Sequence, residues 1–67
     1  MFNRNKFQYF AKERNKTMGE IAKYLNINIT TLYRKMSGES DFTREEVQQL
    51  TEFLRLSWDE SLSVFFA

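Results

Sequence analysis

Three short motifs of the form Ser/Thr-x-x-Glu are the strongest structural constraint in this sequence of 67 residues. In a capping box of this kind, the hydroxyl and the carboxylate each accept a backbone N–H at the start of a helix. The motifs are Thr17–Glu20, Thr43–Glu46 and Ser57–Glu60. They therefore predict three helices, which begin near Met18, Arg44 and Trp58.

Two further helices follow from weaker signals. Asn28 is a good N-cap for a helix over about 29–36, and Gly38 ends it because glycine adopts the left-handed conformation freely. An opening helix over about 4–14 places Phe7, Phe10 and Ala11 on one face. No strand-like alternation is present. We therefore expect an all-α fold, a compact bundle of about five short helices that forms a single domain over 1–67.

Apolar residues at helical spacing predict the core. The expected core-lining residues of the second, third and fourth helices are Ile21, Ala22, Leu25, Leu32, Met36, Val47, Leu50 and Leu54. A second set is expected to seal the ends of the bundle: Phe42, Leu56, Trp58, Leu62, Phe65 and Phe66.

Composition excludes several kinds of chemistry. The chain has no cysteine and no histidine, so it can form neither a disulfide nor a thiolate or imidazole metal site. It has no glycine-rich phosphate loop, and Glu20 and Glu46 are already assigned to caps. We therefore expect no enzyme activity, no metal, no cofactor and no small-molecule substrate. Because there is no signal peptide and no apolar run long enough to span a bilayer, a cytoplasmic location is expected.

Charge is distributed unevenly along the chain. Residues 1–38 carry eight cations and two carboxylates, a net charge of +6, whereas residues 39–67 carry two cations and seven carboxylates, a net charge of −5. This asymmetry favours a basic face for a polyanion and an acidic face turned away from it. The alternative is that the charges decorate two solvated surfaces.

The stretch from Thr17 to Gly38 contains two predicted helices too short to be stable alone, so they must brace each other. Ala22 is small enough to let two helices cross closely. Asn26 suits a left-handed turn, and Ile27 would bury that turn. This pattern is typical of a helix-turn-helix.

The stretch TMGEIAKYLNINITTLYRKMSG, at residues 17–38, resembles the lambda-repressor-like helix-turn-helix family, which includes phage repressors and Cro proteins. The resemblance extends over most of the chain. It implies a bundle of about five helices that binds operator DNA, with the second helix of the motif in the major groove and a dimer on two half-sites.

The resemblance also implies roles for individual residues. The expected base contacts are Asn28, Ile29, Thr30 and Arg34. The expected contacts to the DNA backbone are Thr31, Tyr33, Ser37, Lys23 and Arg44. The other lysines, including Lys35, are expected to be solvated. Met18 departs from the family, because a thioether cannot hold a phosphate as the usual glutamine does.

Ile29 has two possible roles. Isoleucine can make only apolar contact with DNA, for example with a thymine methyl group. Alternatively, Ile29, Leu32, Tyr33 and Met36 follow the spacing of a core stripe.

The function expected from these observations is sequence-specific transcription regulation by a small Cro-like or repressor-like protein in a phage or prophage setting. The alternative is a protein-interaction module, similar to an antirepressor or antitoxin partner, whose surface is the acidic second half and the aromatic C-terminus.

Self-association is predicted at the C-terminus. Adjacent side chains on a helix point about 100° apart, so Phe65 and Phe66 cannot both face one core. One of them is expected to cover the first helix and the other to meet a second copy, in a homodimer weak enough to form only on DNA. The alternative is a monomer in which both rings pack under the first helix.

Overall fold

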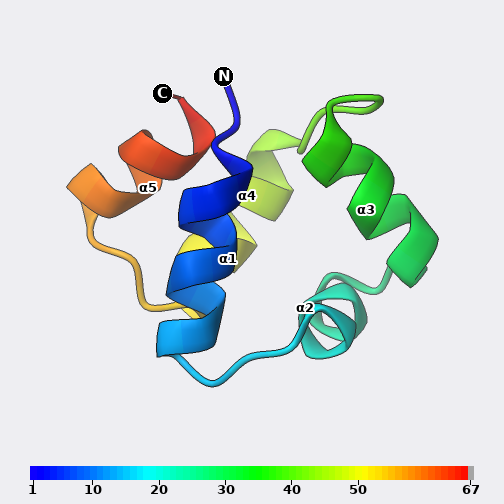
Figure 1. The fold of residues 1–67 in the computed structure, drawn as a ribbon, viewed down its shortest axis with the longest axis horizontal. Helices are drawn as coiled ribbons and strands as arrows, with labels where there is room; N and C mark the ends of the chain where they lie inside the picture. Colours follow the sequence, from blue (N-terminus) through cyan, green and yellow to red (C-terminus); the bar gives the residue numbers. More distant parts are fainter. Residues whose placement is uncertain (67) are drawn as a thin grey trace.

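The computed structural model describes residues 1–66, which form five helices and no strand. The helices are α1 (Arg4–Glu13), α2 (Met18–Leu25), α3 (Ile29–Ser37), α4 (Arg44–Phe53) and α5 (Trp58–Phe65), as Figure 1 shows. This arrangement confirms the predicted all-α bundle. None of these helices is long and apolar enough to cross a membrane.

All three predicted capping boxes form. In the first, the Thr17 backbone N–H donates to Glu20 Oε1 at 2.8 Å, and the Glu20 N–H donates to Thr17 Oγ1 at 3.1 Å. The same reciprocal bonds begin α4 and α5. α3 begins at Asn28, whose Oδ1 accepts the Thr30 N–H at 2.7 Å. The predicted helix starts are therefore confirmed, and Asn3 caps α1 in the same way.

Left-handed residues turn the chain after four of the helices. Asn26 (φ 59°) and Gly38 (φ 91°) end α2 and α3 as predicted. Asn15 (φ 57°) and Arg55 (φ 53°) play the same part after α1 and α4. Glycine and asparagine tolerate this conformation well, whereas an arginine there is unusual.

Three helix pairs make the main contacts of the bundle. α2 packs against both α3 and α4, and α1 packs against α5. Figure 1 shows α3 and α5 at opposite sides of a body that measures 27 × 24 × 21 Å.

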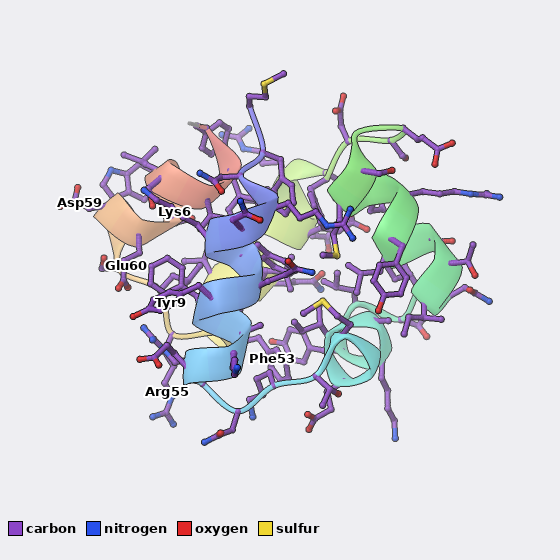
Figure 2. All side chains as sticks on the ribbon, viewed as in Figure 1. Lys6, Tyr9, Phe53, Arg55, Asp59 and Glu60 are labelled. Carbon is purple, nitrogen blue, oxygen red and sulfur yellow. The ribbon has the colours of Figure 1, made fainter. Side chains whose placement is uncertain are left out.

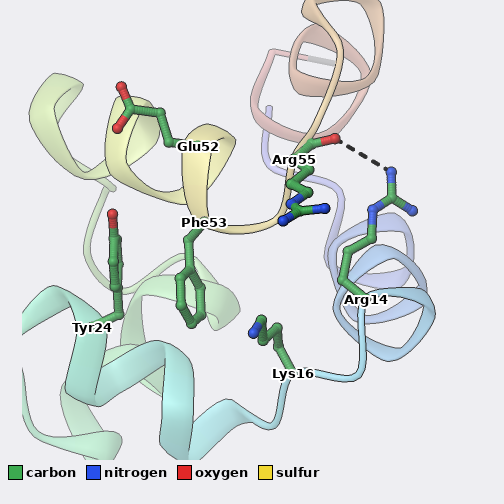
Figure 3. Close-up of a pocket in the computed structure, with 6 residues that line it drawn as sticks. All are labelled: Arg14, Lys16, Tyr24, Glu52, Phe53 and Arg55. Atoms are coloured by element: carbon green, nitrogen blue, oxygen red, sulfur yellow. Dashed lines mark hydrogen bonds between the residues drawn. The ribbon is translucent and has the colours of Figure 1, made fainter.

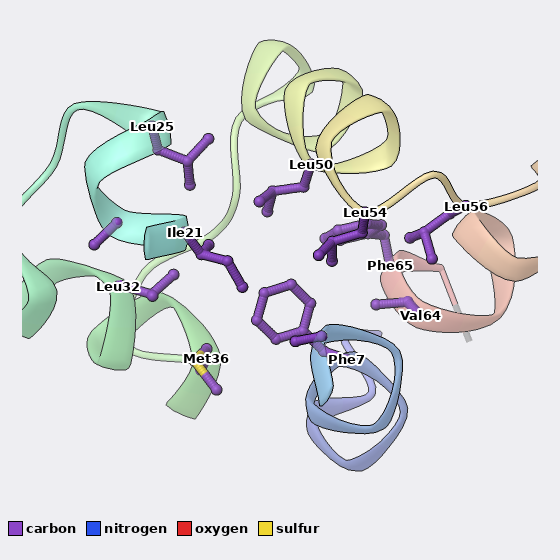
Figure 4. Close-up of a cluster of buried hydrophobic side chains, with 12 residues drawn as sticks. Phe7, Ile21, Leu25, Leu32, Met36, Leu50, Leu54, Leu56, Val64 and Phe65 are labelled. Atoms are coloured by element: carbon purple, nitrogen blue, oxygen red, sulfur yellow. The ribbon is translucent and has the colours of Figure 1, made fainter. Parts of the chain in front are cut away.

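One hydrophobic core joins all five helices. Phe7 of α1 lies at its centre and is fully buried (Figure 4). α2, α3, α4 and α5 each contribute one fully buried side chain, respectively Ile21, Leu32, Leu50 and Val64. The core-lining residues predicted for α2 and α3 are all confirmed, whereas Val47 of α4 is only partly buried against the core.

The predicted seal at the ends of the bundle is wrong for three residues. Trp58, Leu62 and Phe66 are 72%, 36% and 64% exposed. They recur every four residues, so they share one face of α5 and its end, whereas Val64 and Phe65 face the bundle.

The N-terminal segment contributes to the seal instead. The Asn3 N–H donates to the Val64 carbonyl at 2.6 Å, which holds the start of the chain against α5. Phe2 then joins an aromatic cluster, with its ring centroid 4.9 Å from that of Phe42 and 5.8 Å from that of Phe65. Phe2 therefore covers core that the sequence had assigned to the C-terminal aromatic residues.

Candidate nucleic-acid interface

The turn between α2 and α3 fixes the two helices relative to each other. Asn26 reverses the chain in the left-handed conformation, and the Ile27 N–H donates to the Ala22 carbonyl at 3.0 Å. Ala22 is 3% exposed, as expected where two helices cross closely, and Ile27 packs against the core. Asn28 then caps α3. Each step of the predicted turn is present.

α3 has a buried face and an exposed face. Leu32, Lys35 and Met36 are buried. The exposed residues of α3 are Ile29, Thr30, Tyr33, Arg34 and Ser37. At 100° per residue these five span about 140° of the helix surface. The result is a continuous solvent-facing stripe along the length of α3.

The four predicted base-contacting residues lie together at this stripe and its cap. Asn28, Thr30 and Arg34 are exposed. The Oδ1 of Asn28 is occupied by the cap, which leaves its amide nitrogen to donate to another partner. Arg34 lies one turn after Thr30, and its guanidinium forms no ion pair within residues 1–66. Their contact with DNA remains a prediction.

Ile29 lies outside the core, so the interpretation of this residue as part of a core stripe is wrong. It is 42% exposed and lines a shallow surface groove beside Lys23 and Asn28. On a helical wheel Ile29 lies only about 20° from the buried Met36. Ile29 is uncovered because it is the first residue of α3, where the helix extends past the core.

Positive charge lies at both ends of α3. Lys23 is exposed in the last turn of α2, beside the start of α3. Arg44 is exposed at the start of α4, after the loop that follows α3. Neither pairs with a carboxylate in the part of the chain that the structure describes. Both remain suited to phosphate.

The other three residues predicted to contact the DNA backbone differ in exposure and in hydrogen bonding. Tyr33 is 42% exposed, and Thr31 is half-buried at the edge of α3. The Ser37 hydroxyl donates to the Arg34 carbonyl at 3.0 Å and lies 3.4 Å from Glu39 Oε2. The hydroxyl proton of Ser37 is therefore directed to acceptors within the protein. The neighbouring Glu39 carboxylate would also repel a DNA phosphate.

Lys35 is the residue that sequence reasoning misplaced. It was expected to be solvated but is 9% exposed. Its Nζ lies 3.0 Å from Glu46 Oε1 and donates to the Asp41 carbonyl at 3.0 Å. Lys35 therefore ties α3 to the following loop and to α4. Only its angular position on α3, about 60° from that of the buried Leu32, could have indicated this.

The pair also shifts the protonation of Glu46. Burial raises the pKa of this carboxyl, but hydrogen bonds from the Thr43 N–H and from Lys35, together with the charge of Lys35, outweigh burial and lower it below its ordinary value. Glu46 Oε1 also accepts the Thr43 N–H at 2.9 Å, so one oxygen caps α4 and holds Lys35.

Other kinds of site find little support in the described residues. Within residues 1–66 no group of three or more Asp or Glu could hold a metal ion. Every buried side-chain nitrogen or oxygen there has a hydrogen-bond partner. Comparisons with family models, with curated proteins and with solved structures give no match to this chain.

Proposed function

We propose that this chain is a sequence-specific double-stranded DNA-binding transcriptional regulator that reads the major groove with α3. The observation that carries the proposal is the exposed stripe of α3, held on a rigid α2–turn–α3 unit. The major groove of B-DNA is wide enough to admit one α-helix. An exposed stripe that combines Ile29, Thr30 and Tyr33 with an arginine free of ion pairs in the described chain is the kind of surface that such a helix presents.

The side chains suggest how individual bases are read. Arg34 suits a bidentate contact with guanine O6 and N7, and Ile29 suits the methyl group of thymine. The free amide nitrogen of Asn28 donates to a base or to a phosphate. Thr30 lies between these residues on the same exposed face.

Electrostatics supports the same orientation. Lys23 and Arg44 flank α3, and neither is neutralised by a carboxylate in the described chain. Of the seven carboxylates in the second half of the sequence, Asp59 and Glu60 lie on α5, on the opposite side of the molecule from α3 (Figure 1). Four others lie in the loop after α3 or in the first turn of α4, so the support for this orientation comes from Lys23 and Arg44.

A single α3 contacts too few base pairs to select one site in a genome, so pairing of two copies is part of the proposal. Of the two residues predicted to form the pairing surface, only Phe66 is exposed. Phe65 is 7% exposed and packs on Phe2, Phe7 and Phe42, so it presents little surface to a partner. Phe66 is exposed and now lies on one face with Leu62 and Trp58.

The same α5 face supports the second candidate, a protein-interaction module without DNA readout. Three large exposed apolar side chains on one face are typical of a protein contact. Figure 2 shows Asp59 and Glu60 on α5, with Lys6 and Tyr9 on the neighbouring α1. Such a surface suits an apolar partner with basic residues at its rim. A gel shift with random duplex at low salt separates the two candidates.

The decisive experiment is selection of bound duplexes from a random pool. The proposal expects a short enriched motif with two related halves. Recovery of an unenriched pool, together with no gel shift at low salt, would remove DNA readout and leave the interaction module. Enrichment would also support regulation by a Cro-like or repressor-like protein acting on DNA in the cytoplasm.

A further inference from the structure

A cleft of about 500 Å³ opens where the ends of α1, α2 and α4 meet (Figure 3). Its lining residues are Arg14, Lys16, Tyr24, Glu52, Phe53 and Arg55. None of them belongs to α3, so the cleft is separate from the candidate DNA interface. Its volume falls within the range of about 300–1,000 Å³ that is typical of small-ligand sites.

Three cations and one carboxylate, Glu52, line this cleft, and a second carboxylate, Glu60, pairs with Arg14. The Arg14 guanidinium donates to the Arg55 carbonyl at 3.5 Å and lies 3.6 Å from Glu60 Oε1. Lys16 and Arg55 pair with no carboxylate within residues 1–66. Figure 3 shows Glu52 pointing away from Lys16 and Arg55. Bringing like charges together is unfavourable, and an anion bound between them removes that cost.

The backbone at Arg55 gives an independent reason to regard its side chain as functional. Arg55 adopts the left-handed conformation with φ 53° after α4. Glycine or asparagine would make the same turn at lower steric cost, as Asn15 does after α1. Strained residues of this kind concentrate at functional sites. What the arginine adds at this position is a guanidinium beside Arg14 and Lys16.

A flat aromatic wall closes one side of the cleft. The rings of Tyr24 and Phe53 are stacked, with centroids 4.1 Å apart and planes 20° apart. The Lys16 ammonium lies 4.9 Å from the centroid of Phe53. The cleft therefore places a rigid apolar face next to a set of cations. This combination matches a ligand with an anionic group and a planar body.

We propose that the cleft binds a small phosphate-bearing ligand with a planar ring, of the chemical class of a nucleoside monophosphate. The phosphate lies between the guanidinium groups of Arg14 and Arg55 and the ammonium of Lys16. The ring packs against Phe53, and Lys16 moves from the ring face to the phosphate. The site does not depend on DNA binding by α3, so either proposal can be correct when the other is wrong.

The test is an NMR titration of the full chain, followed through the backbone amides at constant ionic strength. The probes are adenosine monophosphate, adenosine and inorganic phosphate, each without DNA. Adenosine monophosphate is expected to saturate at the lowest concentration, because it alone supplies both the ring and the phosphate. The shifts should concentrate at residues 14–16, 24 and 52–56.

Two variants sharpen the test. Arg55→Asn keeps a residue that accepts the left-handed backbone and removes the guanidinium, so it should weaken adenosine monophosphate binding about tenfold. Lys12→Gln removes the same charge from an exposed position outside the cleft. It should leave the affinity unchanged within about twofold, because the exposed Lys12 ammonium does not line the cleft and stays solvated.

Three results would overturn the proposal. Equal losses in both variants, or shifts spread over all basic residues, would show diffuse attraction rather than a site. The absence of any shift with adenosine monophosphate would exclude the small ligand. If Arg55→Asn then weakened duplex binding, the phosphate that meets these cations would be that of the DNA backbone.

Discussion

The Nζ of Lys35 and the Oε1 of Glu46 lie 3.0 Å apart, and their side chains are only 10% and 14% exposed. The two residues belong to α3 and α4, so the pair fixes the end of the proposed reading helix relative to the rest of the bundle. A buried charge that loses its partner costs more than an exposed one. In the proposed function, Lys35 is therefore a positioning residue, because it orients α3 and is not itself exposed to DNA.

The pair makes stability depend on pH in a definite direction. Because folding lowers the pKa of Glu46, its ionised carboxylate stabilises the folded state above the ordinary glutamate value of about 4.3 and loses this contribution as pH falls through the folded-state pKa. We expect Glu46→Gln to reduce the free energy of unfolding by about 1–3 kcal/mol at pH 7. The difference from wild type should shrink in urea titrations as pH falls through the lowered folded-state pKa.

Glu20→Gln is the matched control for this prediction. Glu20 occupies the same capping-box position in α2, and hydrogen bonds with Thr17 lower its pKa, but no buried lysine faces it. Glutamine preserves a capping acceptor in both variants. Equal destabilisation by the two substitutions would contradict a special role for Lys35.

Ile29 and Leu32 should separate DNA contact from core packing. Leu32 is fully buried, so Leu32→Ala should cost about 2–5 kcal/mol of stability. Ile29→Ala removes methyl groups from a half-exposed side chain, so it should cost less than about 1 kcal/mol while weakening binding to a selected duplex. Thermal unfolding and a binding titration measure the two effects. An Ile29→Ala protein that binds DNA normally would exclude the thymine contact.

Arg34 and Lys23 should differ in sequence dependence. Arg34→Ala should cost about 1–3 kcal/mol of binding free energy and relax the preference at one position of the site. Lys23→Ala should weaken binding to all duplexes alike and mildly, because Lys23 is proposed to contact phosphate rather than a base. Titrations with a selected duplex and single-base variants measure both. If both variants lost the same affinity for every duplex, Arg34 would be a contact to the DNA backbone rather than to a base.

Binding to DNA should depend strongly on salt. If each copy contacts about four to six phosphates, log K should fall with log salt at a slope of roughly −4 to −5, because condensed counterions are released. Titrations at several salt concentrations give this slope directly. An affinity that is constant over the same range would be incompatible with phosphate contacts from Lys23 and Arg44.

Phe65 and Phe66 should behave oppositely when each is changed to serine. Phe65→Ser removes a buried ring from the aromatic cluster and should destabilise the fold by about 3 kcal/mol or more. Phe66→Ser alters an exposed ring, so it should leave stability nearly unchanged and reduce cooperative loading of two copies onto a selected duplex. Native mass spectrometry of the protein–duplex complex counts the copies. Two copies bound as cooperatively by Phe66→Ser as by wild type would exclude this surface.

The sequence by itself determined where the helices begin and how α2 and α3 end. Capping boxes such as Thr43–Glu46 and left-handed residues such as Asn26 act over three or four neighbouring residues, so local sequence contains the whole interaction. The same locality explains why the α2–turn–α3 unit was predicted step by step. Its bonds connect residues that are near neighbours in the chain.

Only the tertiary structure decided which side chains are covered. Trp58 is as apolar as a core residue, yet it is exposed, whereas Phe2 packs on Phe42 and Phe65 at the other end of α5. Lys35 looks like any surface lysine until α4 brings Glu46 to it. Arg14 and Arg55 are 41 residues apart and meet only because α1 and α4 end side by side. Burial and long-range charge pairing depend on how helices pack, and a local sequence pattern does not contain that information.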